Sequence, residues 1–322
     1  MTVKNLWAPS QARSRSHGIY QLHSLESGST RRACPALARR ARCPAMKPAA
    51  AIQLGVCAIA IGLGLSVSWL PAPLPSDAPV TPFSAERAWQ HASAIARQPH
   101  PAASEENRRV RAYLCKSMTE LGLAVRELPG KQEGTELGNL YAELPVTAGG
   151  QPAILLVSHY DSVSAGPGAA DCASGVAALL ENVRAVRASG SLRNGIAVLF
   201  TDGEENGLLG ARAFTADQPE LWRDVRVVLN LEARGNRGPV MMFETSPGAR
   251  RLIARLSKSC LYPVACSFSR EIYRRMPNDT EFLKAGRAGM NFAFVGGGLE
   301  YYHTAQDTPE NLSRRTLQHY GS

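Results

Sequence analysis

Residues 153–162 read Ala-Ile-Leu-Leu-Val-Ser-His-Tyr-Asp-Ser, an apolar run that ends in a histidine and an aspartate. An apolar run of this length without polar alternation is typical of a strand buried on both faces of a parallel sheet. The pattern recurs in residues 197–204, where Ala-Val-Leu-Phe precedes Thr-Asp-Gly-Glu, and in residues 227–232, where Val-Val-Leu-Asn-Leu precedes Glu. Such strands, each followed by polar side chains, indicate an α/β protein.

Helical segments separate these strands, as a sheet with two covered faces requires. Ser84 and Ser104 precede helical patterns as N-cap residues. We expect strands at 139–144, 153–158, 196–201, 225–231, 240–244 and 291–295, and helices at 85–96, 104–121, 174–188, 208–216, 249–258, 279–285 and 312–320. The predicted fold is therefore α/β, with a mostly parallel (mixed) central sheet and helices on both faces.

Candidate metal ligands follow several of the predicted strands. In open α/β sheets, ligands bind beyond the carboxyl ends of the strands. Two imidazoles and several carboxylates gathered at that edge would suit a pair of zinc ions. In chain order the candidates are His159, Asp171, Glu204, Glu205, Glu232 and His303. Their order and spacing predict a dizinc hydrolase.

Each fragment taken alone has a plainer interpretation. Asp171 could cap the helix at 174–188, Glu232 could form an ion pair with Arg234, and His303 could be an ordinary loop histidine. The adjacent glutamates 204 and 205 could be a solvated pair. The occurrence of all the fragments together in one chain favours the metal site over these alternatives.

Chemistry assigns provisional roles within this set. Asp161 can accept the second ring N–H of His159 and so fix the orientation of that imidazole. The two oxygens of Asp171 can each face one metal ion. Of the neighbours Glu204 and Glu205, one can bind metal while the other takes a proton from an activated water.

The charge of the chain is concentrated at its N-terminus. The 322 residues carry a formal net charge of +9. Residues 1–48 hold nine lysines and arginines and one acid, Glu26, so the remainder is nearly neutral. Without a basic stripe there, we expect no nucleic-acid partner. The seven cysteines form no C-x-x-C pair; Cys260 and Cys266 are close enough in sequence for a disulfide, but scattered thiols are the favoured interpretation.

The N-terminal quarter divides into short segments before the main domain. We interpret 1–48 as a basic tail, disordered or upstream of the true start at Met46, and 49–70 as a transmembrane helix or, alternatively, a cleaved signal segment. A Pro-rich linker at 71–82 leads into the main domain at 83–322, which carries the predicted dizinc site. The basic flank predicts a single-pass membrane protein with its domain outside the cytoplasm, in the periplasm or secretory lumen; cleavage would instead give a secreted protein.

The fragments together resemble a known group, the co-catalytic dizinc aminopeptidases related to glutamate carboxypeptidase II and the transferrin receptor. The greatest resemblance is to membrane-bound endoplasmic-reticulum metallopeptidases of the Fxna type and their bacterial relatives. It covers roughly residues 82–322 and is carried by residues 98–101 (QPHP), 158–162 (SHYDS), 166–177 (GPGAADCASGVA), 200–210 (FTDGEENGLLG), 230–235 (NLEARG), 278–282 (NDTEF) and 301–304 (YYHT).

The resemblance implies a zinc-exopeptidase-like fold and a residue-by-residue assignment. One Zn²⁺ would be held by His159, Asp171 and Glu232, and a second by Asp171, Glu205 and His303. Glu204 would be the general base and Asp161 the partner of His159. Tyr302 would donate a hydrogen bond to the developing oxyanion, and Asp279 would shape the substrate pocket. The implied activity is hydrolysis of peptide substrates with release of N-terminal amino acids.

Other activities fit the same resemblance. A carboxypeptidase or dipeptidase would use the same metal pair, and transferrin-receptor-like relatives are inactive binding or scaffold proteins. A glutaminyl-cyclase-like transferase shares the fold, although the pair Glu204-Glu205 suits hydrolysis better. The oligomeric state and the substrate side chain have no sequence signal.

Two features depart from the family pattern. Cys172 stands after the bridging aspartate, where Asp or Asn is common; we do not expect it to be a ligand, although its thiol could compete for zinc. The chain ends at Ser322, soon after the helix at 312–320 begins. Because the family domain continues with further helices, we expect a domain shortened at its carboxyl end.

Overall fold

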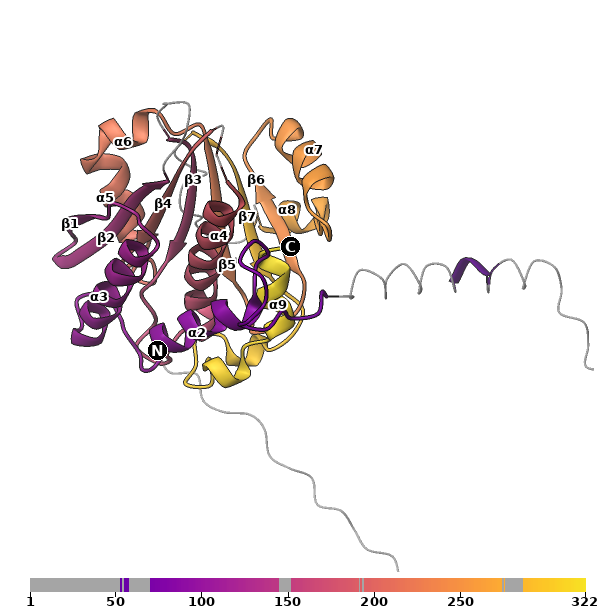
Figure 1. Cartoon of the computed structure of the whole chain (residues 1–322), viewed down its shortest axis with the longest axis horizontal. Coiled ribbons are helices and arrows are strands. Elements are labelled where there is room, and N and C mark those ends of the chain that lie inside the picture. The colour runs from indigo at the N-terminus through magenta and orange to yellow at the C-terminus, as the bar shows by residue number, and fades with distance from the viewer. Residues whose placement is uncertain are drawn as a thin grey trace, which may run out of the picture. The chain divides into compact units, whose positions relative to one another are not determined.

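The computed structural model describes residues 53, 55–57, 70–144, 152–190, 192, 194–273, 275 and 286–322 (Figure 1). The basic tail at 1–48, nearly all of the predicted membrane segment at 49–70, and Asp279 with the helix expected at 279–285 lie outside these residues. Contacts group residues 53–322 into one compact unit. No helix within the described ranges has the length and apolar character needed to cross a bilayer.

A seven-stranded sheet forms the centre of the described structure, in the order β1-β2-β4-β3-β5-β7-β6. Strands β4, β3, β5 and β7 are parallel to one another, whereas β1, β2 and β6 pair antiparallel at the two sides. The predicted mixed sheet with a parallel centre is therefore confirmed. The strands are β1 Arg126–Gln132, β2 Thr135–Leu144, β3 Pro152–His159, β4 Gly195–Thr201, β5 Val227–Ala233, β6 Val240–Thr245 and β7 Ala288–Phe294.

Both faces of the sheet are covered by apolar side chains, which explains the uninterrupted apolar runs in the sequence. Leu155 and Val157 of β3 pack on one face with Phe214 of α5 (Leu209–Asp217), while Leu156 of the same strand packs against the core on the opposite face. That second core includes Val176 and Leu180 of α4 (Gly175–Ser189). The alternation of strand side chains thus divides a single apolar strand between two cores.

Helices α2, α3, α4, α5, α7 and α9 lie where the sequence predicted helices, whereas α6 and α8 were not predicted. Ser84 caps α2 by accepting the backbone N–H of Arg87, and Ser104 caps α3 by accepting that of Asn107. The helical elements are α2 Ala85–Ile95, α3 Glu105–Glu120, η1 Ala169–Ser174, α4 Gly175–Ser189, α5 Leu209–Asp217, α6 Pro219–Arg223, α7 Arg250–Ser259, α8 Ser267–Tyr273, η3 Leu299–Tyr301, η4 Pro309–Asn311 and α9 Arg314–Tyr320.

Strand β1 was not predicted from the sequence. Its residues, Arg-Glu-Leu-Pro-Gly-Lys-Gln, lack the apolar content of a buried strand. It forms as the edge strand of a hairpin with β2, and the turn residues Glu133 and Gly134 have φ of 50° and 86°. A two-residue turn with both φ values positive matches the twist of a hairpin, so turn geometry rather than burial specifies β1.

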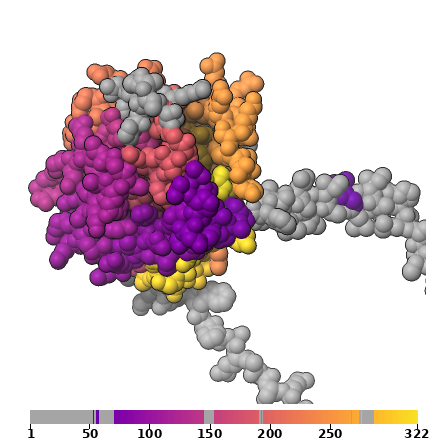
Figure 2. Space-filling view, in the orientation of Figure 1, coloured from indigo at the N-terminus to yellow at the C-terminus, as the bar shows by residue number. Residues whose placement is uncertain are grey.

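The Pro-rich segment at 71–82 lies against the folded domain. The guanidinium of Arg87 donates to the backbone oxygens of Ser76, Ala78, Pro79 and Pro82. The backbone N–H of Leu74 donates to Gln318 of α9 at 2.8 Å. Figure 2 shows the indigo surface of this N-terminal segment next to the yellow surface of the C-terminal residues. Residues 71–82 therefore contact both the first helix of the domain, through Arg87, and its last helix, through Gln318.

Candidate metal centre and substrate pocket

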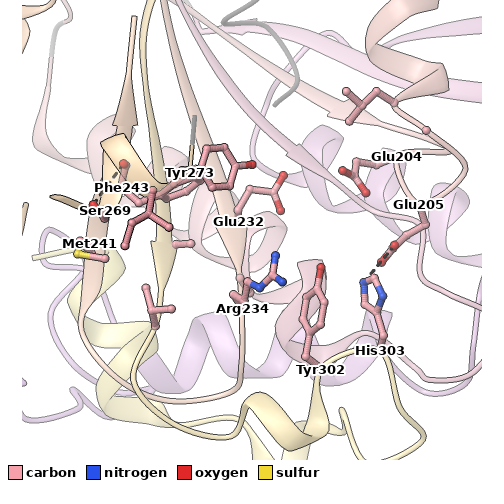
Figure 3. A pocket seen from close by; sticks show the side chains of 16 residues that line it. Glu204, Glu205, Glu232, Arg234, Met241, Phe243, Ser269, Tyr273, Tyr302 and His303 are labelled. Atoms are coloured by element: carbon pink, nitrogen blue, oxygen red, sulfur yellow. Dashed lines mark hydrogen bonds and ion pairs between the residues drawn. The ribbon is translucent and has the colours of Figure 1, made fainter. Parts of the chain in front are cut away.

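The carboxyl edge of the parallel strands brings the predicted metal ligands together. His159 is the last residue of β3, Glu232 lies near the end of β5, and Glu204 and Glu205 follow β4. His159 Nε2 lies 3.6 Å from Glu232 Oε2 and 4.0 Å from Glu204 Oε2. Figure 3 shows Glu204, Glu205, Glu232 and His303 around one cavity. The side chains come from separate strands and loops but form one cluster.

Asp171 lies between the two imidazoles. Its Oδ1 is 3.4 Å from His159 Nε2, and its Oδ2 is 3.0 Å from His303 Nε2. His303 Nε2 is also 3.2 Å from Glu205 Oε2. Each oxygen of Asp171 thus faces a different histidine, which is the arrangement that a carboxylate shared by two cations needs.

The donor atoms fit zinc in type and in spacing. One group consists of His159, Asp171, Cys172 and Glu232, and another of Asp171, Glu205 and His303, with the donor atoms in each group within 4.8 Å of one another. Nitrogen and carboxylate donors of this kind are typical of catalytic zinc sites. Glu205 Oε1 is buried without a hydrogen-bond partner, an arrangement that costs free energy unless a cation occupies the space beside it.

The cluster strongly favours positive charge. Burial acts to lower the pKa of His159, but the surrounding carboxylates, chiefly Glu204 and Glu232, raise it well above its ordinary value. Burial likewise opposes protonation of His303, yet Asp171 and Glu205 raise its pKa to about 10. The negative carboxylates stabilise the protonated forms of His159 and His303. Metal ions bound in the cluster would balance the same negative charge.

The carboxylate of Asp161 accepts two backbone N–H groups in addition to lying near the imidazole of His159. Its Oδ1 accepts the N–H of Glu204 at 3.0 Å and its Oδ2 accepts the N–H of Glu205 at 3.2 Å. His159 Nδ1 is 3.1 Å from the backbone oxygen of Asp161 and 3.5 Å from its Oδ1. The sequence predicted the His159 contact but not the two amide contacts, because these depend on how the loop after β4 folds back over β3.

His303 reaches the cluster because a glycine lets its loop approach. A Cβ atom at Gly166 would lie 2.0 Å from the backbone oxygen of Thr304, so only glycine fits there. His303 itself has a φ of 58°, in the left-handed region. Its ring stacks on that of Tyr302, with centroids 3.9 Å apart. Tyr302 lines the same cavity, where burial and then Asp171 and Glu205 raise the pKa of its phenol.

Arg234 and Glu232 have separate partners and do not form the ion pair that their positions in the sequence suggested. The Arg234 guanidinium lies over the ring of Tyr302, 5.3 Å from the centroid. Glu232 instead contacts His159 and accepts from the side-chain amide of Asn230 at 3.2 Å. The alternative in which Glu232 serves as the ion-pair partner of Arg234 is therefore not the arrangement found.

Cys172 lies directly below the cluster. Its Sγ is 3.1 Å from Ser158 Oγ and donates to the backbone oxygen of Leu231 at 3.2 Å. Burial raises the pKa of this thiol well above its ordinary value, which favours the neutral form. Cys172 belongs geometrically to one donor group, but the hydrogen bond of its thiol is directed at backbone.

Asp307 is a site residue that the sequence did not reveal. Its Oδ1 accepts the N–H of Ala170 at 2.8 Å, its Oδ2 accepts the N–H of Asp171 at 3.2 Å, and its backbone oxygen accepts the N–H of Ala169. Burial raises its pKa to about 7. The available signal was a carboxylate four positions after His303, in a loop that already had to reach the metal centre.

A cavity of about 520 Å³ opens beside the cluster. Figure 3 shows its polar side, with Glu204, Glu205, Glu232, Arg234, Tyr302 and His303, and its other side near Met241, Phe243 and Tyr273. A cavity of this size with a few polar groups against an apolar wall has the character of a binding site for a small molecule or a peptide end. Its apolar wall comes from β6, β7 and α8.

Comparison with known proteins places this architecture in a family. Residues 139–322 match the model of peptidase family M28. The chain is 31% identical over 191 residues to endoplasmic reticulum metallopeptidase 1 of Mus musculus, covering 57% of this chain and 21% of that protein. It is 28% identical over 258 residues to the vacuolar membrane protease of Schizosaccharomyces pombe, covering 73% of this chain and 30% of that protein. The chain thus spans less than a third of the length of these relatives.

Solved structures share the fold at low sequence identity. The aminopeptidase from Aneurinibacillus sp. strain AM-1 superposes with a TM-score of 0.60 at 16% identity, covering 74% of this chain and 92% of that one. The glutaminyl cyclase of Tannerella forsythia superposes with a TM-score of 0.62 at 20% identity, covering 74% and 96%. The structures show an aminopeptidase-like fold, and the sequence match shows the family: the chain belongs to peptidase family M28, a family of zinc-dependent peptidases.

Proposed function

We propose that this chain is a dizinc peptidase that releases N-terminal amino acids from peptides. The observation that carries the proposal is the position of Asp171, whose two carboxylate oxygens face His159 Nε2 and His303 Nε2 separately. A carboxylate that served only to hold the fold would need only one of these two histidine partners. Two imidazoles on opposite oxygens, each with a further glutamate beside it, fit a carboxylate shared between two metal ions.

The proposed ligand sets follow from these contacts. His159, Asp171 and Glu232 would hold one zinc ion, and Asp171, Glu205 and His303 the other. When bound, zinc lowers the pKa of a water molecule and polarises a carbonyl group.

The remaining groups belong to the chain itself. Asp161 accepts the backbone N–H groups of Glu204 and Glu205 and so fixes the backbone from which both carboxylates extend. Glu204 is proposed to accept the proton of the attacking water at its carboxylate and to deliver it to the leaving amine. Tyr302, held against His303, is proposed to donate a hydrogen bond from its hydroxyl group to the oxyanion.

A hydrolase is favoured over a cyclase by the pair Glu204 and Glu205. One carboxylate faces His303 and the other lies 4.0 Å from His159, so the site offers a ligand and a base to a water nucleophile. The names of matched proteins include both aminopeptidases and glutaminyl cyclases, and the shared fold does not separate them. Assays with glutaminyl peptides, which a cyclase converts with loss of ammonia, distinguish the two.

The test of the function uses the full chain and aminoacyl p-nitroanilides. We expect hydrolysis that is abolished by a chelator, restored by zinc, and reduced by at least about a thousandfold in Glu204→Gln, since a general base and its proton transfers are lost. Glu310→Gln, an exposed glutamate in the loop after His303, is the control. Cleavage only of C-terminal residues would favour the carboxypeptidase; no hydrolysis by folded, zinc-loaded protein would favour the scaffold protein.

We also propose that residues 49–70 anchor the protein, with the peptidase domain outside the cytoplasm. The support is the uncharged stretch between Ala49 and Leu70, its basic N-terminal flank, and the membrane named in the description of one matched relative, the vacuolar membrane protease. Alkaline extraction of membranes, followed by protease digestion of sealed vesicles, tests both parts. Release into the alkaline supernatant would contradict anchoring.

A further inference from the structure

The cavity beside the metal centre contains one basic side chain of the Lys/Arg type among its described lining residues, Arg234. It follows β5 directly and stands two positions after Glu232. Its neighbours on the far side are apolar, namely Met241, Phe243 and Ile272. Arg234 is an exposed residue that lines the open cavity, so its guanidinium is accessible to a ligand bound there.

Arg234 is held in place without using its charge on an acid of the described structure. Its backbone N–H donates to the oxygen of Phe294 at 3.2 Å, which fixes the start of the side chain. The guanidinium rests over the ring of Tyr302, 5.3 Å from the centroid. No ion pair between Arg234 and an acid in the described ranges accompanies this stacking, whereas the neighbouring Arg237 pairs with Glu300 at 3.6 Å.

Two glutamates of the cavity, Glu205 and Glu232, are directed at histidines and not at Arg234. Glu205 and Glu232 face His303 and His159, and both are proposed metal ligands. Once these carboxylates serve the metals, Arg234 is left as a positive group in the open part of the cavity. A guanidinium presents parallel N–H donors that match the two oxygens of a carboxylate.

We propose that Arg234 binds a carboxylate of the substrate. This inference rests on the proposed peptidase function and adds a substrate class to it: peptides that place a negative charge close to the scissile bond. Two sources share that chemistry, the α-carboxylate of a dipeptide and the side chain of an acidic residue. The apolar wall formed by Met241, Phe243 and Ile272 would receive the uncharged part of the same substrate.

The stacking on Tyr302 gives Arg234 a fixed position rather than a second function. The Tyr302 ring stacks on His303 and also lies under the guanidinium of Arg234, so the cation is placed close to the candidate metal centre. A pre-positioned guanidinium loses little side-chain freedom when a carboxylate binds. Its effect should therefore appear mainly in KM for charged substrates.

The test compares Arg234→Met with wild type in the full, zinc-loaded chain. Methionine keeps much of the aliphatic stem and removes the charge. Arg237→Met, on the same loop and outside the cavity lining, is the matched control. The substrate pairs are Leu-Ala against Leu-Ala amide, and Glu-p-nitroanilide against Leu-p-nitroanilide. In each pair only one member carries the carboxylate in question.

We expect Arg234→Met to lower kcat/KM by about 10-fold or more, mainly through KM, for the charged member of one pair, since a hydrogen bond to a charged group has about this value. The neutral members should change by less than about threefold. Loss with Leu-Ala alone identifies the α-carboxylate, and loss with the Glu anilide alone identifies the side chain. Equal losses on charged and neutral substrates, or no loss, overturn the proposal.

Binding separates this inference from the proposed function. Calorimetry with the same four compounds on Glu204→Gln, with and without Arg234→Met, measures recognition where turnover is absent. We expect a dissociation constant at least about tenfold weaker for the charged compound when Arg234 is replaced. If wild type cleaves nothing but this difference is present, the peptidase assignment fails and the carboxylate site stands. If cleavage occurs and the difference is absent, the carboxylate site fails alone.

Discussion

The carboxylate of Asp307 accepts the backbone N–H of Asp171 at 3.2 Å, from a loop that also carries His303. The same carboxylate accepts the N–H of Ala170 at 2.8 Å. Asp307 therefore fixes the backbone on which the central carboxylate of the cluster stands. Residues that orient metal ligands in this way affect the metal without touching it.

Replacement of Asp307 should weaken metal binding. Asp307→Ala removes the acceptor of two buried N–H groups, and we expect zinc affinity to fall by about 10-fold to 100-fold. Competition with a chromogenic chelator measures this. Glu310→Gln, an exposed change in the same loop, should leave the affinity as it is. Unchanged affinity in Asp307→Ala would show that the loop is held by other contacts.

Gly166 should not tolerate a side chain. In Gly166→Ala the new Cβ would meet the backbone oxygen of Thr304 at 2.0 Å, so the loop with His303 must move. We expect a loss of zinc affinity together with a destabilisation of about 1–3 kcal/mol, the range for overpacking. Gly130→Ala is the matched control, because its Cβ meets only Ala213 at 3.6 Å. Equal zinc binding by both variants would contradict the role given to Gly166.

The buried Glu181 should hold the Pro-rich segment to the domain. It is 1% exposed and accepts from Arg87 Nε at 2.9 Å, Arg184 Nε at 2.6 Å and the N–H of Ser84 at 2.8 Å. Removing one partner of a buried ion pair costs about 3–5 kcal/mol, so Glu181→Ala should lower the free energy of unfolding by that amount. Chemical denaturation provides the measurement, and limited proteolysis should show earlier cleavage at 71–82.

Glu133→Ala is the control for the loss of stability predicted in Glu181→Ala. Glu133 pairs with Arg212 at 2.9 Å, but both side chains are more than half exposed. An exposed pair of this kind contributes about 0–1 kcal/mol. Similar losses in Glu133→Ala and Glu181→Ala would contradict the importance given to the buried network.

The cysteines should differ in reactivity with pH. Burial and then Glu127 raise the pKa of Cys115 to about 11. The thiolate is the reactive form, so Cys115 should react slowly with iodoacetamide at pH 8 and faster as the pH rises toward 11. The exposed Cys57 and Cys266 should react before Cys115. Peptide mass spectrometry after timed alkylation measures the order, and prompt labelling of Cys115 at pH 8 would contradict it.

The sequence predicted most of the parallel sheet because buried parallel strands leave long apolar runs. Residues 153–158 became β3 Pro152–His159, and 196–201 became β4 Gly195–Thr201. The edge strand β1 and the helix α8 escaped prediction, since neither has the apolar periodicity of a buried element. The hairpin turn specifies β1, and α8 packs on β6.

The residues of the candidate site also differ in how well the sequence predicted them. His159, Glu204, Glu205 and Glu232 could be named because parallel strands bring their carboxyl ends to one edge. The position of Asp307 could not, because its backbone contacts depend on the path of the loop after η3. Arg234 was visible beside Glu232, but only the structure shows its guanidinium over Tyr302. Local sequence thus predicted which carboxylates and imidazoles gather at the sheet edge better than it predicted the groups that hold them.

Zinc content per chain tests the central claim most directly. Elemental analysis of the purified full chain, together with circular dichroism to establish folding, should give about two zinc ions in wild type and in Glu204→Gln. Folded Asp171→Asn should bind less zinc at both positions, because the shared carboxylate faces both His159 and His303. One zinc ion in wild type, or two retained in Asp171→Asn, would contradict a metal pair joined by Asp171.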